Sequence, residues 1–301
     1  MRLARCLLAA CGAAGLCAFL TLGTTGPYIV DSLILRTILG TRVDNVDALI
    51  ASPHAHAPAK LESNRWRREY PATNTSILIF VNSGFMPWVD HLLLNLQALD
   101  LFDYLTVIAE DRKCHAALRA RGVSATLAGR GPDEPAGSPG SMIDFRSQAY
   151  RTFVHKMPRH VLRLLHAGAI HTQTSPPPAA ISRAATLPSC ACVPGRSVLL
   201  LDADVTLLAN PFEYLAPLGH DLYVQDDFRE LNSRLNGGFF FARATPASIG
   251  VFESMLQLIK MHPDTYNQPA FNWAVVRNRH RLRLRVLDPL YFANGKARST
   301  H

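Results

Sequence analysis

The sequence lacks the cysteine pattern of a disulfide-stabilised protein. It has six cysteines, and three of them lie within the first 17 residues, inside one hydrophobic run. The other three are an odd number and do not form a disulfide framework. Cys190 and Cys192 have no second ligand pair at zinc spacing, so we expect ordinary loop cysteines there.

Recognised nucleic-acid-binding motifs are also missing, although the formal net charge is +8 and comes mostly from arginine. The densest basic cluster, residues 277–285, alternates like a strand, which predicts a solvated strand face. No basic platform studded with aromatic residues accompanies it. We therefore expect no nucleic-acid partner.

Charged residues are absent from Cys6 to Val30, directly after Arg2 and Arg5. This run is long enough to cross a bilayer, which needs about 20 apolar residues. The positive-inside rule then predicts a single-pass type II protein, with residues 1–30 as cytosolic tail and membrane anchor. A cleaved signal peptide is the alternative, and either one sends the chain into the secretory pathway. The sequon at Asn74 is compatible with that route.

The part after the hydrophobic run divides by composition. Residues 31–75 mix proline, histidine and charge without a period and predict a stem. Residues 76–301 are expected to form one α/β domain. Within it, residues 171–195 are rich in Pro, Ala, Ser and Thr and predict a disordered insertion.

The domain is expected to open with a β-α-β unit. Residues 77–81 and 105–109 are short apolar runs typical of buried parallel strands, and residues 88–99 have helical spacing. Ligands of open α/β sheets bind beyond the carboxyl ends of the strands, which points to Asn82, Glu110 and Asp111. Capping of the next helix is the alternative for Asp111. A helix bent near Pro158 is expected over residues 147–167, followed by a strand at 197–201.

The strongest chemical signal is Asp202-Ala-Asp204 at the end of that last strand. Residues two apart in a regular strand point to the same face, so both carboxylates can reach one cation. Hard oxygen ligands suit Mg²⁺ or Mn²⁺, which neutralise a diphosphate. Acidic pairs also cap turns or hold structural calcium, and the pair alone does not decide between these roles.

Further blocks follow in order: Asn210-Pro-Phe212, Gln225-Asp-Asp227, Leu235-Asn-Gly-Gly-Phe-Phe-Phe-Ala-Arg243 and Asn267-Gln-Pro-Ala-Phe-Asn272. Together with Asp-Ala-Asp they resemble the nucleotide-diphospho-sugar transferase family that includes plant xylosyl- and arabinosyltransferases. The resemblance covers most of residues 76–295. It implies a GT-A fold (a Rossmann-like, mainly parallel mixed sheet flanked by helices), a Mn²⁺-dependent reaction that retains configuration, a nucleotide-sugar donor, a glycan or glycoprotein acceptor, and a Golgi membrane location.

The resemblance also suggests roles around the donor. Gly237 and Gly238 remove side chains where the backbone approaches a sugar, and Asn236 can bond a hydroxyl; a strand bulge is the alternative. Gln268 is expected at the anomeric carbon, or else as a helix cap. Asp226 and Asp227 belong to the donor site in this interpretation.

Arg146, just before the long helix, is a candidate for the donor phosphates, because guanidinium matches phosphate oxygens; a surface salt bridge is the alternative.

Two departures from the family pattern motivate a second hypothesis. Asn267 stands where the family usually has an acid, and the chain stops at His301, before a His-Asn-rich segment expected to supply a third metal ligand. A non-catalytic protein that binds nucleotide sugar or glycan is therefore the alternative function. A sugar nucleotidyltransferase fits less well, because residues 81–85 are a poor match to the Gly-rich loop of those enzymes.

Overall fold

A computed structural model describes residues 65–128, 147–167, 195–215, 219–227, 235–289 and 291–293, all within one compact unit, Asn45–His301. The predicted anchor (1–30), most of the stem, Arg146 and nearly all of the predicted insertion (171–195) lie outside these residues. Within the described part, no helix has the length and apolar character needed to cross a bilayer.

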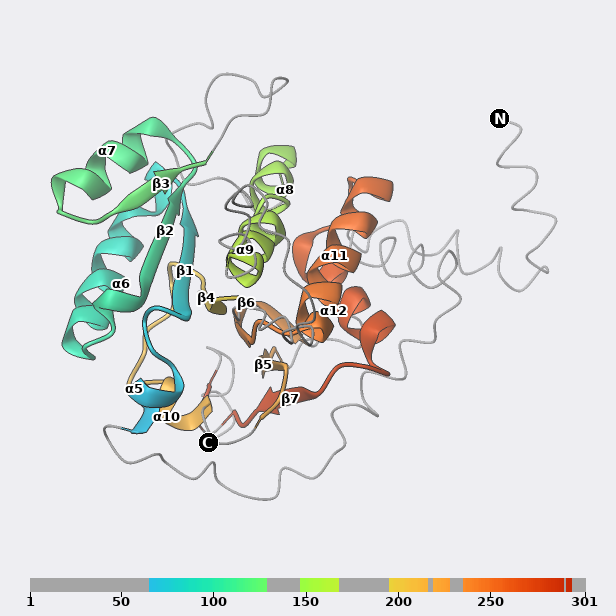
Figure 1. The fold of residues 1–301 in the computed structure, drawn as a ribbon. Helices are drawn as coiled ribbons and strands as arrows, with labels where there is room; N and C mark the ends of the chain where they lie inside the picture. The colour runs from blue at the N-terminus through green and yellow to red at the C-terminus, as the bar shows by residue number, and fades with distance from the viewer. Residues whose placement is uncertain are drawn as a thin grey trace, which may run out of the picture. The chain divides into compact units, whose positions relative to one another are not determined.

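A single seven-stranded sheet carries the fold (Figure 1), in the order β3-β2-β1-β4-β6-β5-β7. The strands are β1 (Thr75–Val81), β2 (Leu105–Ala109), β3 (Ala125–Leu127), β4 (Ser197–Leu201), β5 (Leu222–Asp226), β6 (Leu235–Ala242) and β7 (Leu284–Leu287). Only β6 runs antiparallel to both its neighbours, β4 and β5, while the other pairs are parallel. The expected mixed, mainly parallel α/β sheet is confirmed.

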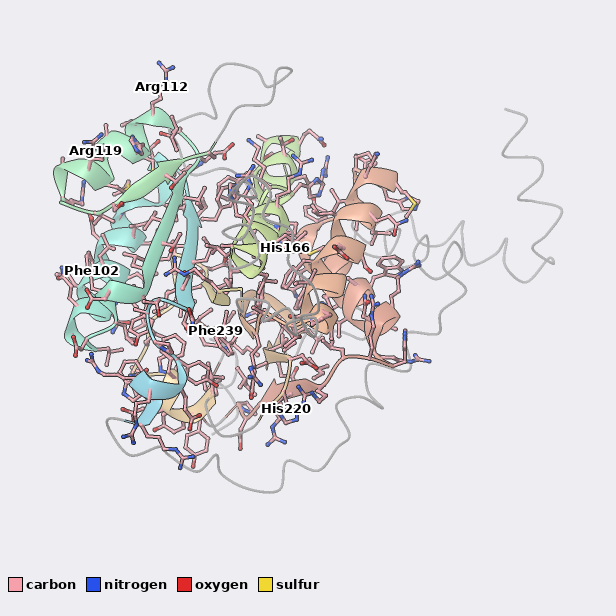
Figure 2. The ribbon with its side chains drawn as sticks, viewed as in Figure 1. Phe102, Arg112, Arg119, His166, His220 and Phe239 are labelled. Atoms are coloured by element: carbon pink, nitrogen blue, oxygen red, sulfur yellow. The ribbon has the colours of Figure 1, made fainter. Side chains whose placement is uncertain are left out.

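Helices cover both faces of the sheet. They are α5 (Arg65–Glu69), α6 (Met86–Ala98), α7 (Arg112–Ala120), α8 (Gln148–Val154), α9 (Met157–His166), α10 (Phe212–Leu215), α11 (Pro246–Met261) and α12 (Asn267–Asn278), with short 3-10 turns η1 (Ser83–Phe85) and η2 (Phe102–Tyr104). Figure 1 shows α6 and α7 on one side of β1 and β2, and α9 and α11 on the other. Helix α7 is amphipathic: Cys114 and Leu118 are buried, while Arg112 and Arg119 project outward (Figure 2).

The first half is the predicted β-α-β unit. β1 and β2 pair in parallel with Ile77 opposite Leu105, and α6 connects them. Apolar residues recur on one face of α6 and are buried there, which is why this segment forms a helix against the sheet. The three-residue strand β3 was not predicted, because its pattern is too short to register.

Buried aromatic rings extend the core beyond the predicted domain start. Trp66 on α5 is 3% exposed and stacks on Phe212 with ring centroids 5.9 Å apart. Tyr70 packs edge-on against Phe241 and donates its hydroxyl to the Leu215 carbonyl. The folded part thus includes residues that the sequence assigned to the stem.

Two segments adjust the sequence predictions. The bent helix expected near Pro158 is in fact two helices. Pro158 lies in the first turn of α9, where backbone N–H groups have no partner within the helix, so the N–H that proline lacks is not missed. The basic cluster at 277–285 is not one strand: α12 continues through Asn278, and β7 begins only at Leu284. The expectation of a strand over its first half is wrong, because the α12–α11 packing overrides a local period of two.

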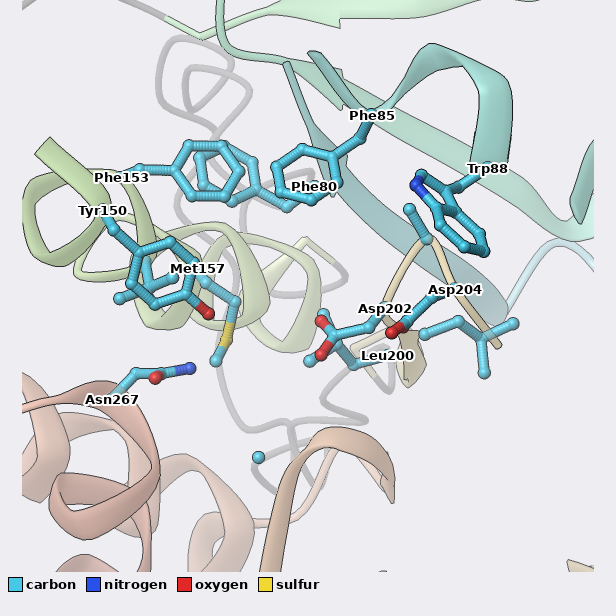
Figure 3. Close-up of a pocket in the computed structure, with 14 residues that line it drawn as sticks. Phe80, Phe85, Trp88, Tyr150, Phe153, Met157, Leu200, Asp202, Asp204 and Asn267 are labelled. Atoms are coloured by element: carbon cyan, nitrogen blue, oxygen red, sulfur yellow. The ribbon is translucent and has the colours of Figure 1, made fainter. Parts of the chain in front are cut away.

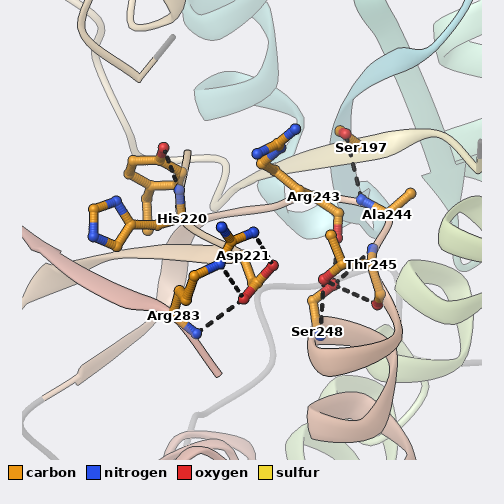
Figure 4. Close-up of polar contacts among 9 residues, drawn as sticks. Ser197, His220, Asp221, Arg243, Ala244, Thr245, Ser248 and Arg283 are labelled. Atoms are coloured by element: carbon orange, nitrogen blue, oxygen red, sulfur yellow. Dashed lines mark hydrogen bonds and ion pairs between the residues drawn. The ribbon is translucent and has the colours of Figure 1, made fainter. Parts of the chain in front are cut away.

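Polar contacts fix the far end of the sheet (Figure 4). Asp221 accepts bonds from the Arg283 backbone N–H (2.9 Å) and from its guanidinium Nε and Nη2 (3.2 and 3.1 Å), which joins β5 to β7. Burial alone would raise the pKa of Asp221, but these bonds outweigh it and hold the pKa below its usual value. Thr245 and Ser248 form a capping box at the start of α11.

Candidate active site

A cavity of about 530 Å³ opens at the carboxyl ends of β1 and β4. β1 continues to β2 and β3 on one side, and β4 continues to β6 on the other, so the crevice lies where the strand order changes direction. Open α/β sheets bind their ligands at this point. Asp202 and Asp204 form an acidic wall, aromatic rings form a second wall, and Asn267 lies on a third side (Figure 3). Gly237 also lines the cavity.

The two aspartates reach the cavity through a turn. β4 ends at Leu201, and the Val205 N–H bonds back to the Asp202 carbonyl at 3.1 Å. The strand alternation expected from sequence is therefore not what aligns them. Both side chains are exposed to the cavity, and Figure 3 shows both carboxylates directed into it.

Electrostatics of the pair favour a cation. Protein atoms crowd around the Asp202 carboxylate although it remains open to the cavity, and this desolvation raises its pKa to about 6, with repulsion from Asp204 adding to it. Among the residues described, no group of three or more His, Cys, Asp or Glu side chains could hold a metal ion. Two carboxylates still fit Mg²⁺ or Mn²⁺, which commonly bind one or two carboxylates together with substrate phosphates and water.

Gly238 makes room for Asp202. A Cβ atom at Gly238 would lie 2.0 Å from Asp202 Oδ2 and 2.6 Å from its Cγ. The Gly238 carbonyl also accepts the Asp202 N–H at 2.9 Å, so β6 positions both the backbone and the side chain of this aspartate. At Gly237, by contrast, a Cβ atom would meet its nearest neighbours at 3.5 Å, an ordinary contact.

A bulge in the β5–β6 pairing shapes this segment. Val224 pairs with Phe240 but Asp226 pairs with Leu235, so several residues of β6 bulge past Gln225. Asn236 holds the bulge: its Nδ2 donates to Gln225 Oε1 at 2.6 Å, and its Oδ1 accepts the Gly238 N–H at 2.8 Å. The glycine pair therefore lies in a bulge, as one of the two alternatives predicted, and the two bonds of Asn236 stabilise it.

Gln268, in the first turn of α12, is tied to the same bulge. Its Oε1 accepts the Gly237 N–H at 3.3 Å, and its Nε2 donates to Asp227 Oδ2 at 2.9 Å. Asp227 and Asp226 are buried, at 8% and 4% exposure. The structure thus brings these predicted donor-site residues together as a framework beneath Gly237, and Asp227 orients Gln268.

The residues predicted at the ends of β1 and β2 have mixed placements. Asn82 is fully buried; its Oδ1 accepts the Gly84 N–H, and its Nδ2 has no hydrogen-bond partner among the described residues. Asp111 accepts the N–H groups of Ser83 and Cys114, at 2.7 and 2.8 Å, and caps α7. The capping alternative for Asp111 is therefore what its side chain does.

Glu110, just after β2, pairs with Lys156, the N-cap residue of α9, and both side chains are largely buried. This pair links the β1–β2 half to the helices on the opposite face. Neither Glu110 nor Asp111 lines the cavity, and Arg146 lies outside the described residues.

The aromatic wall was missed by sequence reasoning. It consists of five rings from β1, η1, α6 and α8, namely Phe80, Phe85, Trp88, Tyr150 and Phe153. Trp88 carried a signal only as the first apolar residue of a predicted helix. Tyr150 and Phe153 come from a helix about 70 residues after Phe80, and no local sequence pattern predicts that these rings meet.

Fold and cavity together define a class: an open α/β protein with an acidic ligand site at the carboxyl ends of its strands. Comparison with known proteins adds a family resemblance. Residues 194–301 match the family model for nucleotide-diphospho-sugar transferases. The predicted resemblance is thereby confirmed for the last third of the chain, from the end of the predicted insertion to His301.

Three other proteins similar to this chain are also named as glycosyltransferases. The UDP-D-xylose:L-fucose alpha-1,3-D-xylosyltransferase of Arabidopsis thaliana is 22% identical over 306 residues, covering 93% of this chain and 74% of that protein. The glycosyltransferase GlyE of Streptococcus pneumoniae TIGR4 matches with a TM-score of 0.41 and 10% identity, over 72% of this chain and 46% of GlyE. A glycosyltransferase involved in glycosylation of the PBCV-1 major capsid matches with a TM-score of 0.35 and 13% identity, over 71% and 82%. The chain thus spans less than half of GlyE.

Proposed function

We propose that the chain is a metal-dependent glycosyltransferase. It moves a sugar from a nucleoside-diphosphate sugar to a glycan or glycoprotein acceptor, with retention of configuration. The observation that carries this proposal is the pair of carboxylates, Asp202 and Asp204, directed into a cavity of about 530 Å³ at the switch point of the sheet. That volume lies in the range of small-molecule sites, about 300–1,000 Å³.

Asp202 and Asp204 would hold Mn²⁺ or Mg²⁺. Such an ion supplies charge neutralisation for the donor diphosphate as it leaves. Gly238 keeps the Asp202 carboxylate in place, because any side chain there would displace it. Gln268, held by Asp227 and by the Gly237 N–H, would lie beside the donor sugar.

The first experiment combines binding and turnover on the full chain. Donor hydrolysis is measured with UDP-xylose, UDP-arabinose, UDP-glucose and UDP-galactose, with Mn²⁺ or with chelator. UDP-xylose and an L-fucose acceptor lead the panels because the plant relative is named for them. UDP binding by calorimetry gives a readout that does not depend on turnover.

Asp202→Asn and Asp204→Asn are expected to abolish Mn²⁺-dependent UDP binding and to lower hydrolysis at least about 100-fold. Asp103→Asn is the matched control, since Asp103 is exposed in η2 just before β2, at the opposite end of that strand. Unchanged Mn²⁺-dependent UDP binding in both variants would show that these two aspartates do not hold the metal ion. The anomeric configuration of the product, read by NMR, tests retention.

Asn267 favours one alternative. It lines the cavity with an amide, at the position where the family resemblance leads us to expect an acid. A protein that binds nucleotide sugar without transferring it would bind UDP with Mn²⁺ yet hydrolyse none of the donors. If any donor is turned over and chelator stops the turnover, the protein is a transferase and not only a binding protein.

We also propose that the chain resides in the Golgi membrane as a type II protein, anchored by residues 1–30. The support is the uncharged run from Cys6 to Val30 after two arginines. Protease protection of the C-terminal part in intact vesicles tests the orientation. Degradation without detergent would contradict it.

A further inference from the structure

One ring of the aromatic wall differs from the others. Phe80 and Phe153 stack with centroids 4.5 Å apart, and Phe85 and Tyr150 pack around Phe153 at 6.3 and 6.4 Å. Trp88 has no ring partner within the described part of the chain, and it is 48% exposed. It is the open member of a wall whose other rings contact one another.

The position of Trp88 is fixed by the helix beneath it. α6 is attached to the segment after the aspartates by Asn95, whose Nδ2 donates to the Leu207 carbonyl (2.8 Å) and whose Oδ1 accepts the Leu207 N–H (2.7 Å). Trp88 lies two turns before Asn95, on the same face of the helix. It therefore faces the beginning of that segment, and Figure 3 shows its ring next to Asp204, on the side away from Asn267.

This geometry suits a sugar ring arriving from solvent. The donor, with its diphosphate at Asp202 and Asp204, would fill the interior of the cavity between the carboxylates and Asn267. An acceptor must enter at the rim, where a half-exposed indole stands beside the carboxylates. Pyranose rings have faces of C–H groups, which pack on aromatic rings while the hydroxyls stay hydrated.

We propose that Trp88 is the stacking platform of the acceptor subsite, and that it takes a saccharide whose acceptor ring offers an apolar C–H face. This inference rests on the proposed glycosyl transfer. It assigns Trp88 to the acceptor and leaves the donor to the interior of the cavity.

The test separates the two substrates. The full chain and the variants Trp88→Ala and Trp88→Phe are compared with UDP plus Mn²⁺ as the donor-side probe. Methyl α-L-fucopyranoside and methyl β-D-galactopyranoside are the acceptor-side probes, followed by saturation-transfer NMR of their ring protons and by product formation. Leu94→Ala is the matched control, because Leu94 is also a large exposed residue of α6, at 66% exposure.

For Trp88→Ala we expect unchanged UDP affinity and unchanged donor hydrolysis, loss of saturation transfer to the methyl pyranosides, and an acceptor KM raised about tenfold. Trp88→Phe should fall between Trp88→Ala and the unaltered chain, and Leu94→Ala should behave like the unaltered chain.

A fall in UDP affinity in Trp88→Ala would place the ring at the donor and overturn the proposal. So would unchanged saturation transfer in that variant, or no saturation of either methyl pyranoside by an unaltered chain that binds UDP. If the unaltered chain neither binds UDP nor hydrolyses a donor, the proposed function itself fails, which is a distinct result.

Discussion

Gly238→Ala is the sharpest test of the metal site. The new Cβ would lie 2.0 Å from Asp202 Oδ2, whereas Cβ contacts below 3.0 Å essentially do not occur. The carboxylate must therefore move by about 1 Å or rotate away. The backbone itself accepts alanine, because Gly238 is not among the glycines with positive φ. The strain falls on the side chain proposed to hold the cation.

The expected loss is large for function and small for folding. A displacement of about 1 Å at a reacting group costs about 100-fold in rate. Overpacking of this kind costs about 1–3 kcal/mol of unfolding free energy. We expect a folded variant whose Mn²⁺ affinity, measured with UDP by the loss of the free Mn²⁺ signal in electron paramagnetic resonance, falls at least about tenfold.

Gly237→Ala is the control, since its Cβ would meet only ordinary contacts at 3.5 Å. We expect it to retain Mn²⁺ binding. Equal loss in both variants would refute the steric argument, because it would show that the bulge, and not the space beside Asp202, determines binding. Normal Mn²⁺ binding by Gly238→Ala would show that Asp202 need not occupy its present position.

Three further predictions concern stability. Lys156→Met removes the ammonium paired with the buried Glu110 and should lower the free energy of unfolding, measured in urea, by about 3 kcal/mol. Adding Glu110→Gln should restore most of that loss. If the losses of the two single variants simply added in the double variant, the pairing would be contradicted. Burial, and then nearby cations, lower the pKa of His160 to about 4. The stability that this neutral histidine allows above pH about 6.5 is therefore lost as the pH falls toward 4. Between pH 6.5 and 5, the free energy of unfolding should fall by about 2 kcal/mol less in His160→Gln than in the unaltered chain. The same pH dependence in the variant and the unaltered chain would refute this. Asp221 has a lowered pKa, so its bonds to Arg283 stabilise the fold fully above pH about 4, and this stabilisation is lost as the pH falls through the lowered pKa. Asp221→Asn should cost about 1–2 kcal/mol at pH 7 and progressively less as the pH falls below about 4; thermal unfolding over this pH range measures the difference.

Local patterns predicted the strands that carry the site. Ser197–Leu201 and Leu105–Ala109 are apolar runs of strand length, and both strands form with those bounds. The sequence also placed Asp202 and Asp204 at a strand end. The turn that directs them into the cavity was not predictable, because it depends on Gly238, which lies on a neighbouring strand.

Long-range packing accounts for what was missed. Trp66 was assigned to the stem because the apolar residues of its segment show no regular spacing. In the structure it is buried against Phe212, nearly 150 residues later. Asp111 was equally compatible with a ligand or a cap, and only the 2.8 Å bond from the Cys114 N–H decides. Side-chain patterns report the face of an element, not its distant partner.

The pairing of β1 with β4 also has a consequence for the order in which the chain folds. Thr75 of β1 pairs with Ser197 of β4, 122 residues later, whereas β1, α6 and β2 are close neighbours in sequence. Closing so long a loop is slow compared with forming local contacts. The crevice at the ends of these two strands therefore forms only when this long loop has closed. Any ligand that binds there stabilises only the completed sheet.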